Sequence, residues 1–464
     1  MPRTSLSDVV STHLIPLVRV RGGDDSELGI LERMRHHGVP GVQLTTIEDG
    51  EITWTGTYGE LELASGRHVD ERSLFQAASI SKPVTALAVL RLVAEGTLNL
   101  DQPVNGYLRS WQLPENDHTR LRPVTLRALL SHTAGTTVHG FPGYAVGAPL
   151  PTIQEILDGE PPANTKPVRV ELPVGEQFRY SGGGTMIVQQ LLAEVTGQNF
   201  ADLMRILVLE PLGMADSTFE QPLPQHLHSR AATAHDESGV VPGQWHVYPE
   251  MAAAGLWTTA SDLARYVRGV QGALAGLTDS LIPPALAREM VASQNGVPVG
   301  LGPQLMGMEG DRRFIHSGGN RGFQCRFVGF VDHTDGIVVM TNGPFTAALL
   351  LNEIIGAVGA ASGWVDFPLV EVVPIAQSDD LDRFVGDYEL RGVIVTVGLH
   401  NDRLVMTTPF GQTVEMWRVS DREFVLPDTT RVTFEITGQR AARATLKQWG
   451  DVYVATRAEV GLQA

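Results

Sequence analysis

The stretch that decides the fold is residues 74–98, LFQAASISKPVTALAVLRLVAEGTL. The part from Ser79 to Glu95 is apolar on nearly every side, which predicts a buried helix, and Gly96 is typical of a helix end. Pro83 fits such a helix only in the first turn, where its missing N–H costs nothing. The pattern therefore places Ser79 at the N-terminus of a buried helix.

Ser79 and Lys82 form an S-x-x-K pattern, which occurs once in a chain that has only three lysines. On a helix, residues i and i+3 share a face, so the ammonium lies beside the hydroxyl. A serine hydroxyl is a poor nucleophile until a base takes its proton, and burial can lower the pKa of a lysine enough for that task. The Ser79 N–H also lies where the helix dipole favours negative charge. The pair predicts nucleophilic catalysis, although a capping serine beside a surface lysine would give the same letters.

The composition excludes several classes of protein. The chain has 464 residues, 35 Lys+Arg and 52 Asp+Glu, a net charge of −17, and 43% hydrophobic residues. This is the balance of a globular protein with two or three domains, and its acidity disfavours nucleic acids and anionic membranes as partners. The single cysteine, Cys325, excludes an intrachain disulfide and thiolate metal clusters, and it is expected to be a buried apolar residue of a strand. The histidines lack metal-ligand spacing, so no metal and no cofactor are expected.

Targeting signals are also missing from the pattern. The first 25 residues lack the apolar run of about 7–15 residues that a signal peptide needs, and no run approaches the roughly 20 residues of a membrane span. The expected compartment is therefore the cytoplasm.

The remaining patterns predict a mixed α/β chain. Residues 41–58 alternate around Asp49-Gly50, which predicts a β-hairpin. Helical patterns and long loops fill residues 97–260, and strand patterns return over 312–342. Residues 365–378 are expected to be a linker, and the eight short alternating strands of residues 379–464 predict a small antiparallel β-barrel.

Two more motifs carry chemistry. Tyr180-Ser181-Gly182 precedes a helical pattern, and a phenol there can exchange a proton with the Ser79–Lys82 pair. His316-Ser317-Gly318-Gly319 lies in a strand pair, where small residues let a substrate approach the backbone and an N–H can complete an oxyanion hole. Taken singly, the first motif is also consistent with a tyrosine that only packs in the core. The second is also consistent with a glycine-rich hairpin end.

With these motifs in this order, the chain resembles the β-lactamase-like serine hydrolases. They include class C β-lactamases, D-Ala-D-Ala carboxypeptidases of the penicillin-binding protein type, D-aminopeptidases and β-lactamase-like carboxylesterases. The resemblance covers about residues 25–362. It rests on residues 74–98 together with the segments LNLDQPVNGYL, VTLRALLSHTAG, FRYSGGGTMIVQQLLAEVTG, LEPLGMADSTF, MAAAGLWTTASDLARYV and FIHSGGNRGF.

The resemblance implies a fold and a set of roles. The fold would be an antiparallel sheet flanked by helices over residues 1–364, with residues 97–260 inserted as a helical subdomain. A lipocalin-like barrel would follow over residues 379–464. Ser79 would be the nucleophile, Lys82 its base and Tyr180 the proton relay to the leaving group. His316 would take the place of the first residue of the family's Lys-Thr-Gly motif, and the N–H groups of Ser79 and Gly319 would form the oxyanion hole.

Two departures from the family pattern bear on the substrate. The family has an asparagine that grips the substrate amide where this chain has Gly182, and a strand lysine where this chain has His316. An imidazole need not be charged at pH 7. Both changes favour esters or uncharged amides. The expected activity is therefore a metal-free carboxylester hydrolase, followed by a D-amino-acid peptidase and then a β-lactamase, with acyl transfer to an alcohol left open.

Other expectations concern binding. Two further classes of function stay open: a non-catalytic binding protein on the same scaffold, and a carrier of an apolar ligand in the barrel. The role expected for the C-terminal domain is to cover the site or to mediate self-association. The partner is expected to be a small ester, amide or peptide. The residues expected to contact it are Phe141, Tyr144, Gly182, Tyr248, Ser317, Gly318 and Arg321.

Overall fold

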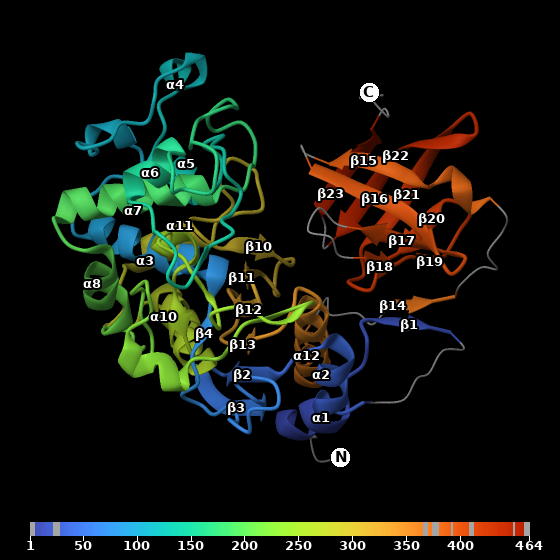
Figure 1. Cartoon of the computed structure of the whole chain (residues 1–464). Coiled ribbons are helices and arrows are strands. Elements are labelled where there is room, and N and C mark those ends of the chain that lie inside the picture. The colour runs from blue at the N-terminus through green and yellow to red at the C-terminus, as the bar shows by residue number, and fades with distance from the viewer. Residues whose placement is uncertain are drawn as a thin grey trace. The chain divides into compact units, whose positions relative to one another are not determined.

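The computed structural model describes residues 5–21, 28–364, 370–373, 380–390, 393–407, 413–448 and 451–458. The chain divides into two compact units (Figure 1). Residues 34–351 form one unit, and residues 1–33 together with residues 352–464 form the other. The N-terminal segment thus belongs with the C-terminal part of the chain, which the domain boundaries expected from the sequence did not include.

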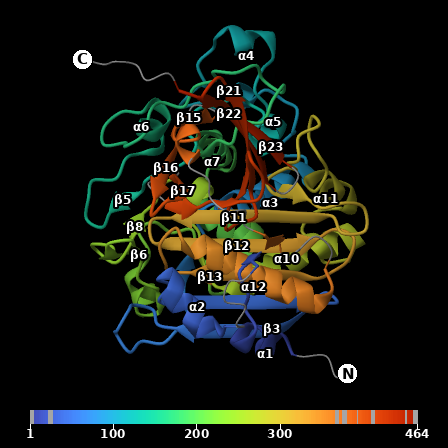
Figure 2. The same ribbon diagram turned by 90° about the vertical axis from the view of Figure 1, so that its right-hand side faces the viewer.

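A six-stranded sheet is the centre of the unit 34–351, with the strand order β10-β11-β12-β13-β2-β3. Each neighbouring pair is antiparallel, and Figure 2 shows β11, β12 and β13 side by side. The pairing of β13 with β2 joins the two ends of the unit's sequence. The strands are β2 Gly41–Glu48, β3 Glu51–Gly59, β10 Gln304–Met306, β11 Arg313–Asn320, β12 Phe323–Phe330 and β13 Gly336–Thr341.

The hairpin β2–β3 confirms the turn expected at Asp49-Gly50. Both residues have positive φ, 52° and 78°, which a two-residue hairpin turn requires. The expected strand pairs of residues 312–342 are also present. The sheet is therefore built from two distant parts of the sequence, as the resemblance implies.

Helices and short strands fill the segment between β3 and β10. The helix α10 packs across β2, β12 and β13, and α7 and α3 both pack on α9. The helices are α3 Ser81–Ala94, α4 Asp117–Leu121, α5 Leu126–Leu130, α6 Ile153–Asp158, α7 Gly182–Thr196, α8 Phe200–Met204, α9 Met251–Ala254, α10 Ala260–Ala275 and α11 Pro284–Met290. The short strands are β4 Phe75–Gln76, β5 Tyr144–Ala145, β6 His235–Asp236, β7 Gly239–Val240, β8 His246–Val247 and β9 Trp257–Thr258.

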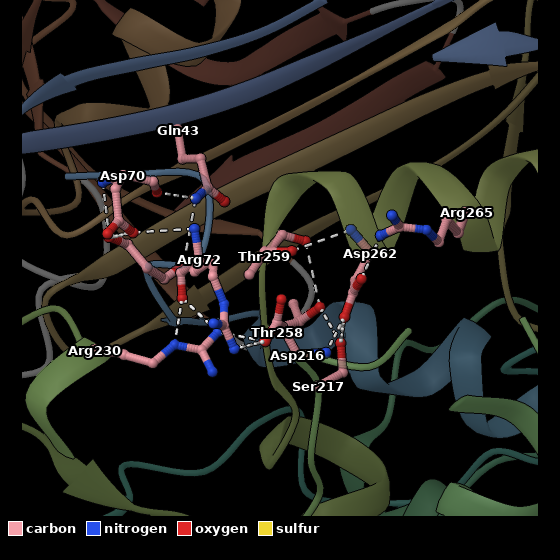
Figure 3. A network of polar contacts seen from close by, with 11 residues as sticks. Gln43, Asp70, Arg72, Asp216, Ser217, Arg230, Thr258, Thr259, Asp262 and Arg265 are labelled. Carbon is pink, nitrogen blue, oxygen red and sulfur yellow. Dashed lines mark hydrogen bonds and ion pairs between the residues drawn. The ribbon is translucent and has the colours of Figure 1, made fainter. Parts of the chain in front are cut away.

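A polar network attaches the start of α10 to the sheet and to the loops around it (Figure 3). The buried carboxylate of Asp262 accepts hydrogen bonds from the Asp216 N–H at 2.9 Å and from the Ser217 hydroxyl at 2.7 Å. Gln43 of β2 accepts from the Ala260 N–H at 2.5 Å and donates to the Asp70 carbonyl at 2.7 Å. Buried polar networks of this kind fix one arrangement of the segments they join. The segment that leads from α9 through β9 into α10 is therefore held firmly.

The second unit contains a nine-stranded antiparallel sheet in the order β18-β17-β16-β15-β23-β22-β21-β20-β19. Its two edge strands, β18 and β19, are consecutive in the chain and separated only by the buried Met416, so the sheet curls into a nearly closed barrel. Phe384, Phe424 and Phe434 fill its interior. The strands are β15 Gly386–Leu390, β16 Val393–His400, β17 Arg403–Thr407, β18 Thr413–Glu415, β19 Trp417–Arg418, β20 Glu423–Val425, β21 Arg431–Thr437, β22 Arg440–Gln448 and β23 Asp451–Arg457.

Short elements complete this unit. The helix α1 is Leu6–Thr12, and β1 Val18–Val20 pairs in parallel with β14 Val370–Val372. The strand β14 lies inside the linker expected at 365–378, of which residues 365–369 and 374–378 lie outside the described residues. The sequence limits of the unit fall within the helices α2 Ile30–His37 and α12 Ala347–Ser362, and inside the unit Arg33 forms a buried ion pair with Glu353.

The expected fold class is confirmed, with two differences in detail. The helix expected from Ser79 begins at Ser81, because Ala78–Ile80 forms a separate 3-10 turn. The barrel part has nine strands among the described residues rather than eight, because the single strand expected around Met416 is divided there into β18 and β19, which pair with β17 and β20.

Candidate active site

A strained turn presents Ser79 at the start of α3. Ala78 has a φ of 47°, a conformation that residues with a side chain rarely adopt and that often occurs at functional sites. The Ala77 N–H donates to the Leu256 carbonyl at 2.8 Å, and the Ser81 hydroxyl donates to the Ala78 carbonyl at 2.6 Å. These bonds hold the turn in place while the Ser79 side chain stays partly exposed.

Lys82 lies beside Ser79, as the i,i+3 spacing predicts. Its ammonium donates to the Ser79 hydroxyl at 2.9 Å and to the Ala253 carbonyl at 2.8 Å. The side chain is only 4% exposed, and this burial lowers the pKa of Lys82 to about 7. A large fraction of Lys82 is therefore neutral near pH 7 and able to accept the Ser79 proton.

Tyr180 approaches the same hydroxyl from the segment before α7. Its phenol is hydrogen-bonded to Ser79, and the Lys82 nitrogen lies 5.0 Å from its ring centre. Burial raises the pKa of Tyr180, and the bond to Ser79 opposes this only in part. The phenol is therefore protonated at neutral pH, which suits a group that gives a proton to a departing oxygen.

His316 closes the site from β11, with its ring centre 6.1 Å from that of Tyr180. Its Nδ1 lies 2.7 Å from the Ser317 carbonyl, so Nδ1 carries the proton and donates it to that oxygen. Its Nε2 is buried and has no hydrogen-bond partner among the described residues. Burial and the Lys82 charge lower the pKa of His316 to about 3. The His316 ring is therefore neutral, as the sequence analysis allowed, and its Nε2 is able to accept a hydrogen bond.

The strand β11 lies directly against the Ser79 turn. A Cβ atom on Gly318 would be 2.1 Å from the Ala77 carbonyl oxygen, so only glycine permits this approach. In the antiparallel register, hydrogen-bonded and non-bonded positions alternate, and Asn320 pairs with Phe323 across a two-residue turn. Gly319 consequently directs its N–H away from β12, and β10 pairs with β11 only as far as Ile315. The Gly319 N–H thus faces an edge without a strand partner.

The other residues expected to contact substrate have varied surroundings. Arg321 forms an ion pair with Asp236 at 2.9 Å, and its N–H donates to the Tyr248 hydroxyl at 3.1 Å. Tyr248 is fully buried, and Tyr144 is 6% exposed and accepts from the Asn164 N–H. These three side chains thus have protein partners. Ser317 accepts from Arg326 at 2.8 Å, and the Phe141 ring lies against Gly182, two residues after Tyr180 in the chain.

The sequence reading missed several groups around the site. The His132 ring lies 4.4 Å from that of Tyr180, and its Nδ1 accepts from the Ser181 N–H at 3.2 Å, so His132 positions the segment that carries Tyr180. His139 was not singled out, yet its ring centre is 4.9 Å from that of Tyr180. Glu250 is fully buried just before α9, and burial raises the pKa of its carboxyl to about 8. The Ala253 backbone carbonyl, which accepts from Lys82, could not be predicted from the sequence, because every residue has a backbone carbonyl.

Two further features concern metal binding and membrane spanning. Within the described ranges, no three His, Cys, Asp or Glu side chains gather where they could hold a metal ion. Among the same residues, no helix combines the length and the apolar character needed to cross a membrane.

Known proteins share both the sequence pattern and the fold. Penicillin-binding protein 4 of Amycolatopsis lactamdurans is 28% identical over 78% of this chain and 95% of its own length. Esterase EstB of Burkholderia gladioli is 27% identical over 57% of this chain and 73% of its own length. The octameric penicillin-binding protein homologue from Pyrococcus abyssi has a TM-score of 0.59 at 20% identity, covers 92% of this chain and 98% of its own, and so shares the fold.

The profile of the family described as Beta-lactamase matches residues 30–359. This is well over half of the chain, and the relatives include hydrolases and an esterase. The chain therefore belongs to the Beta-lactamase family of serine hydrolases.

Proposed function

We propose that the protein hydrolyses carboxylic esters through an acyl-enzyme on Ser79. The observation that carries the proposal is the contact of Lys82 with Ser79 at 2.9 Å beside an uncharged His316. The first contact supplies an activated nucleophile. The uncharged His316 leaves this part of the site without the positive charge that a substrate carboxylate would need.

The steps follow from the positions of these groups. Neutral Lys82 takes the Ser79 proton as the oxygen attacks the ester carbonyl, and the N–H groups of Ser79 and Gly319 stabilise the oxyanion. The oxyanion collapses and expels the alkoxide, which takes the Tyr180 proton, and the Lys82 ammonium returns a proton to Tyr180. Neutral Lys82 then takes a proton from the water that attacks the acyl carbonyl, and the Lys82 ammonium returns this proton to the Ser79 oxygen as the acid leaves.

A D-amino-acid peptidase is the second candidate, because the bare Nε2 of His316 can accept a hydrogen bond from a substrate N–H. A β-lactamase ranks third, because the carboxylate of a β-lactam would find a neutral imidazole. The relatives named penicillin-binding protein and Beta-lactamase keep both candidates in view.

The test compares wild type, Ser79→Ala and Ser65→Ala, the last being an exposed turn serine. We expect p-nitrophenyl butyrate turnover to fall more than about 1,000-fold in Ser79→Ala and to persist in Ser65→Ala. A fluorophosphonate probe should label wild type and Ser65→Ala alone. Turnover of a chromogenic cephalosporin and of D-alanine p-nitroanilide is measured in parallel, and the three rates rank the three activities. Equal ester turnover in Ser79→Ala would refute the proposal.

We propose that the barrel has no ligand-carrying role, because aromatic side chains such as Phe384 and Phe434 fill its interior. Self-association through this unit stays a prediction, and light scattering of the full chain is the measurement that checks it.

A further inference from the structure

The start of α7 consists of three glycines, and the loop of residues 136–141 packs directly on them. The Gly182 N–H donates to the His139 carbonyl and the Gly183 N–H to the Val138 carbonyl, both at 3.0 Å. A Cβ atom on Gly183 would lie 2.7 Å from the Thr137 carbonyl oxygen. The glycines are therefore needed for backbone to meet backbone here.

Phe141 takes the space that a side chain at position 182 would occupy. A Cβ atom on Gly182 would lie 2.8 Å from Cε2 of Phe141 and 3.2 Å from the His139 carbonyl oxygen. Only part of the Phe141 ring packs against the core, and the rest is exposed. Ser181, between Tyr180 and Gly182, is extended (φ −146°, ψ 114°), so positions 180 and 182 face the same side of the chain and the ring lies on the side of Tyr180.

The same loop contributes no charge beside Tyr180. The His139 ring lies 4.9 Å from that of Tyr180, and desolvation and the nearby Lys82 ammonium lower the pKa of His139. Its imidazole is therefore neutral at pH 7. We call residues 136–141 together with Gly182 the loop wall. This wall presents an aromatic ring where a side chain at position 182 would otherwise reach toward the substrate.

We propose that Phe141 determines substrate specificity, and that the loop wall selects esters whose acyl group is an uncharged hydrocarbon. Such a group buries apolar area against the ring. An acylamino group at the same place would lose the water bound to its N–H and C=O and would find no hydrogen-bonding side chain at position 182. This inference rests on the proposed ester hydrolysis and names the acyl group that it prefers.

The first test measures kcat/KM for p-nitrophenyl hexanoate and acetate. We expect Phe141→Ala to lower the hexanoate-to-acetate ratio about 10-fold, the scale at which a hydrophobic pocket discriminates chain length. Val146→Ala is the matched control, because Val146 lies on the same long loop and is 51% exposed. An unchanged ratio in Phe141→Ala would overturn the proposal. It would leave ester hydrolysis itself standing as long as turnover still depends on Ser79.

The second test uses the clash between the two positions. Gly182→Asn alone drives a side chain into the Phe141 ring and should lower turnover of every ester. The double variant Phe141→Ala/Gly182→Asn removes the clash with the ring and leaves only the 3.2 Å approach to the His139 carbonyl oxygen. It should recover turnover and raise the ratio of N-acetylglycine ester to hexanoate ester about 10-fold above wild type. Purely additive effects of the two changes would contradict the proposal. If Gly182→Asn does not fold, the Phe141→Ala ratio still decides.

Discussion

The Ser79 site has two sides that differ in chemistry. On one side the turn Ala77–Lys82 is clamped to the segment around Ala253 and to β11, and its polar groups are engaged with one another. On the other side the loop wall is neutral and partly apolar, and backbone contacts at glycines hold it. The difference teaches that reactivity and substrate choice depend on separate segments. Changes on the turn side should therefore act on kcat, and changes on the loop wall on the choice of ester.

The largest effect is expected from removing the base. Lys82→Ala leaves no group 2.9 Å from the Ser79 hydroxyl to take its proton, so kcat for p-nitrophenyl butyrate should fall at least roughly 100-fold. Lys166→Ala is the matched control, because it removes another lysine whose side chain is exposed. A Lys82→Ala enzyme with near wild-type kcat would mean that the turn side does not control the chemistry.

The next effect concerns the contact between β11 and the turn. Gly318→Ala places a Cβ atom 2.1 Å from the Ala77 carbonyl oxygen, so the strand must move away from Ser79 and the two oxyanion N–H groups must separate. We expect kcat to fall about 100-fold or more, the cost of losing one oxyanion donor, and thermal stability to fall with it. In Gly319→Ala the added Cβ meets only the flexible Gln324 side chain, at 3.1 Å, so the fall should be smaller. Equal effects of the two variants would argue against this packing.

The turn side was largely predictable from the sequence, and the loop wall was not. The i,i+3 spacing of Ser79 and Lys82 is a local property of a helix, so it survives even though Ala78–Ile80 forms its own 3-10 turn. The contact of Phe141 with Gly182 joins a loop to the start of α7 across about 40 residues, and no periodicity in the sequence predicts such a contact. The sequence shows that position 182 has no side chain, but it does not show that the Phe141 ring fills this place.

The pH dependence should also separate the two sides. Neutral Lys82 is the active form, so kcat/KM should rise with pH through a midpoint of about 7 and keep roughly a tenth of its plateau at pH 6. His316→Lys adds a positive charge beside Lys82, which disfavours its ammonium form and should move the midpoint below 7. The neutral variant His316→Gln should keep the midpoint near 7. If the midpoint is unchanged in His316→Lys, a group other than Lys82 controls the rise of kcat/KM with pH.

The smallest effect is expected from strain in the loop wall. Val138 is β-branched and has a φ of 62°, a conformation that costs of order 1–3 kcal/mol and that glycine adopts freely. Val138→Gly removes this cost, but it adds about 0.4–1 kcal/mol of chain entropy to the unfolded state and loses the packing of the half-buried Val138 side chain on the core. The relief of strain should offset these losses, so Tm measured by scanning calorimetry should stay within roughly 2 °C of wild type. Val146→Gly, on the same loop without a positive φ, carries only the entropic loss and should lower Tm. Equal losses in the two variants would show that the wall stores no strain, and the backbone bonds to Gly182 and Gly183 would then suffice to hold it.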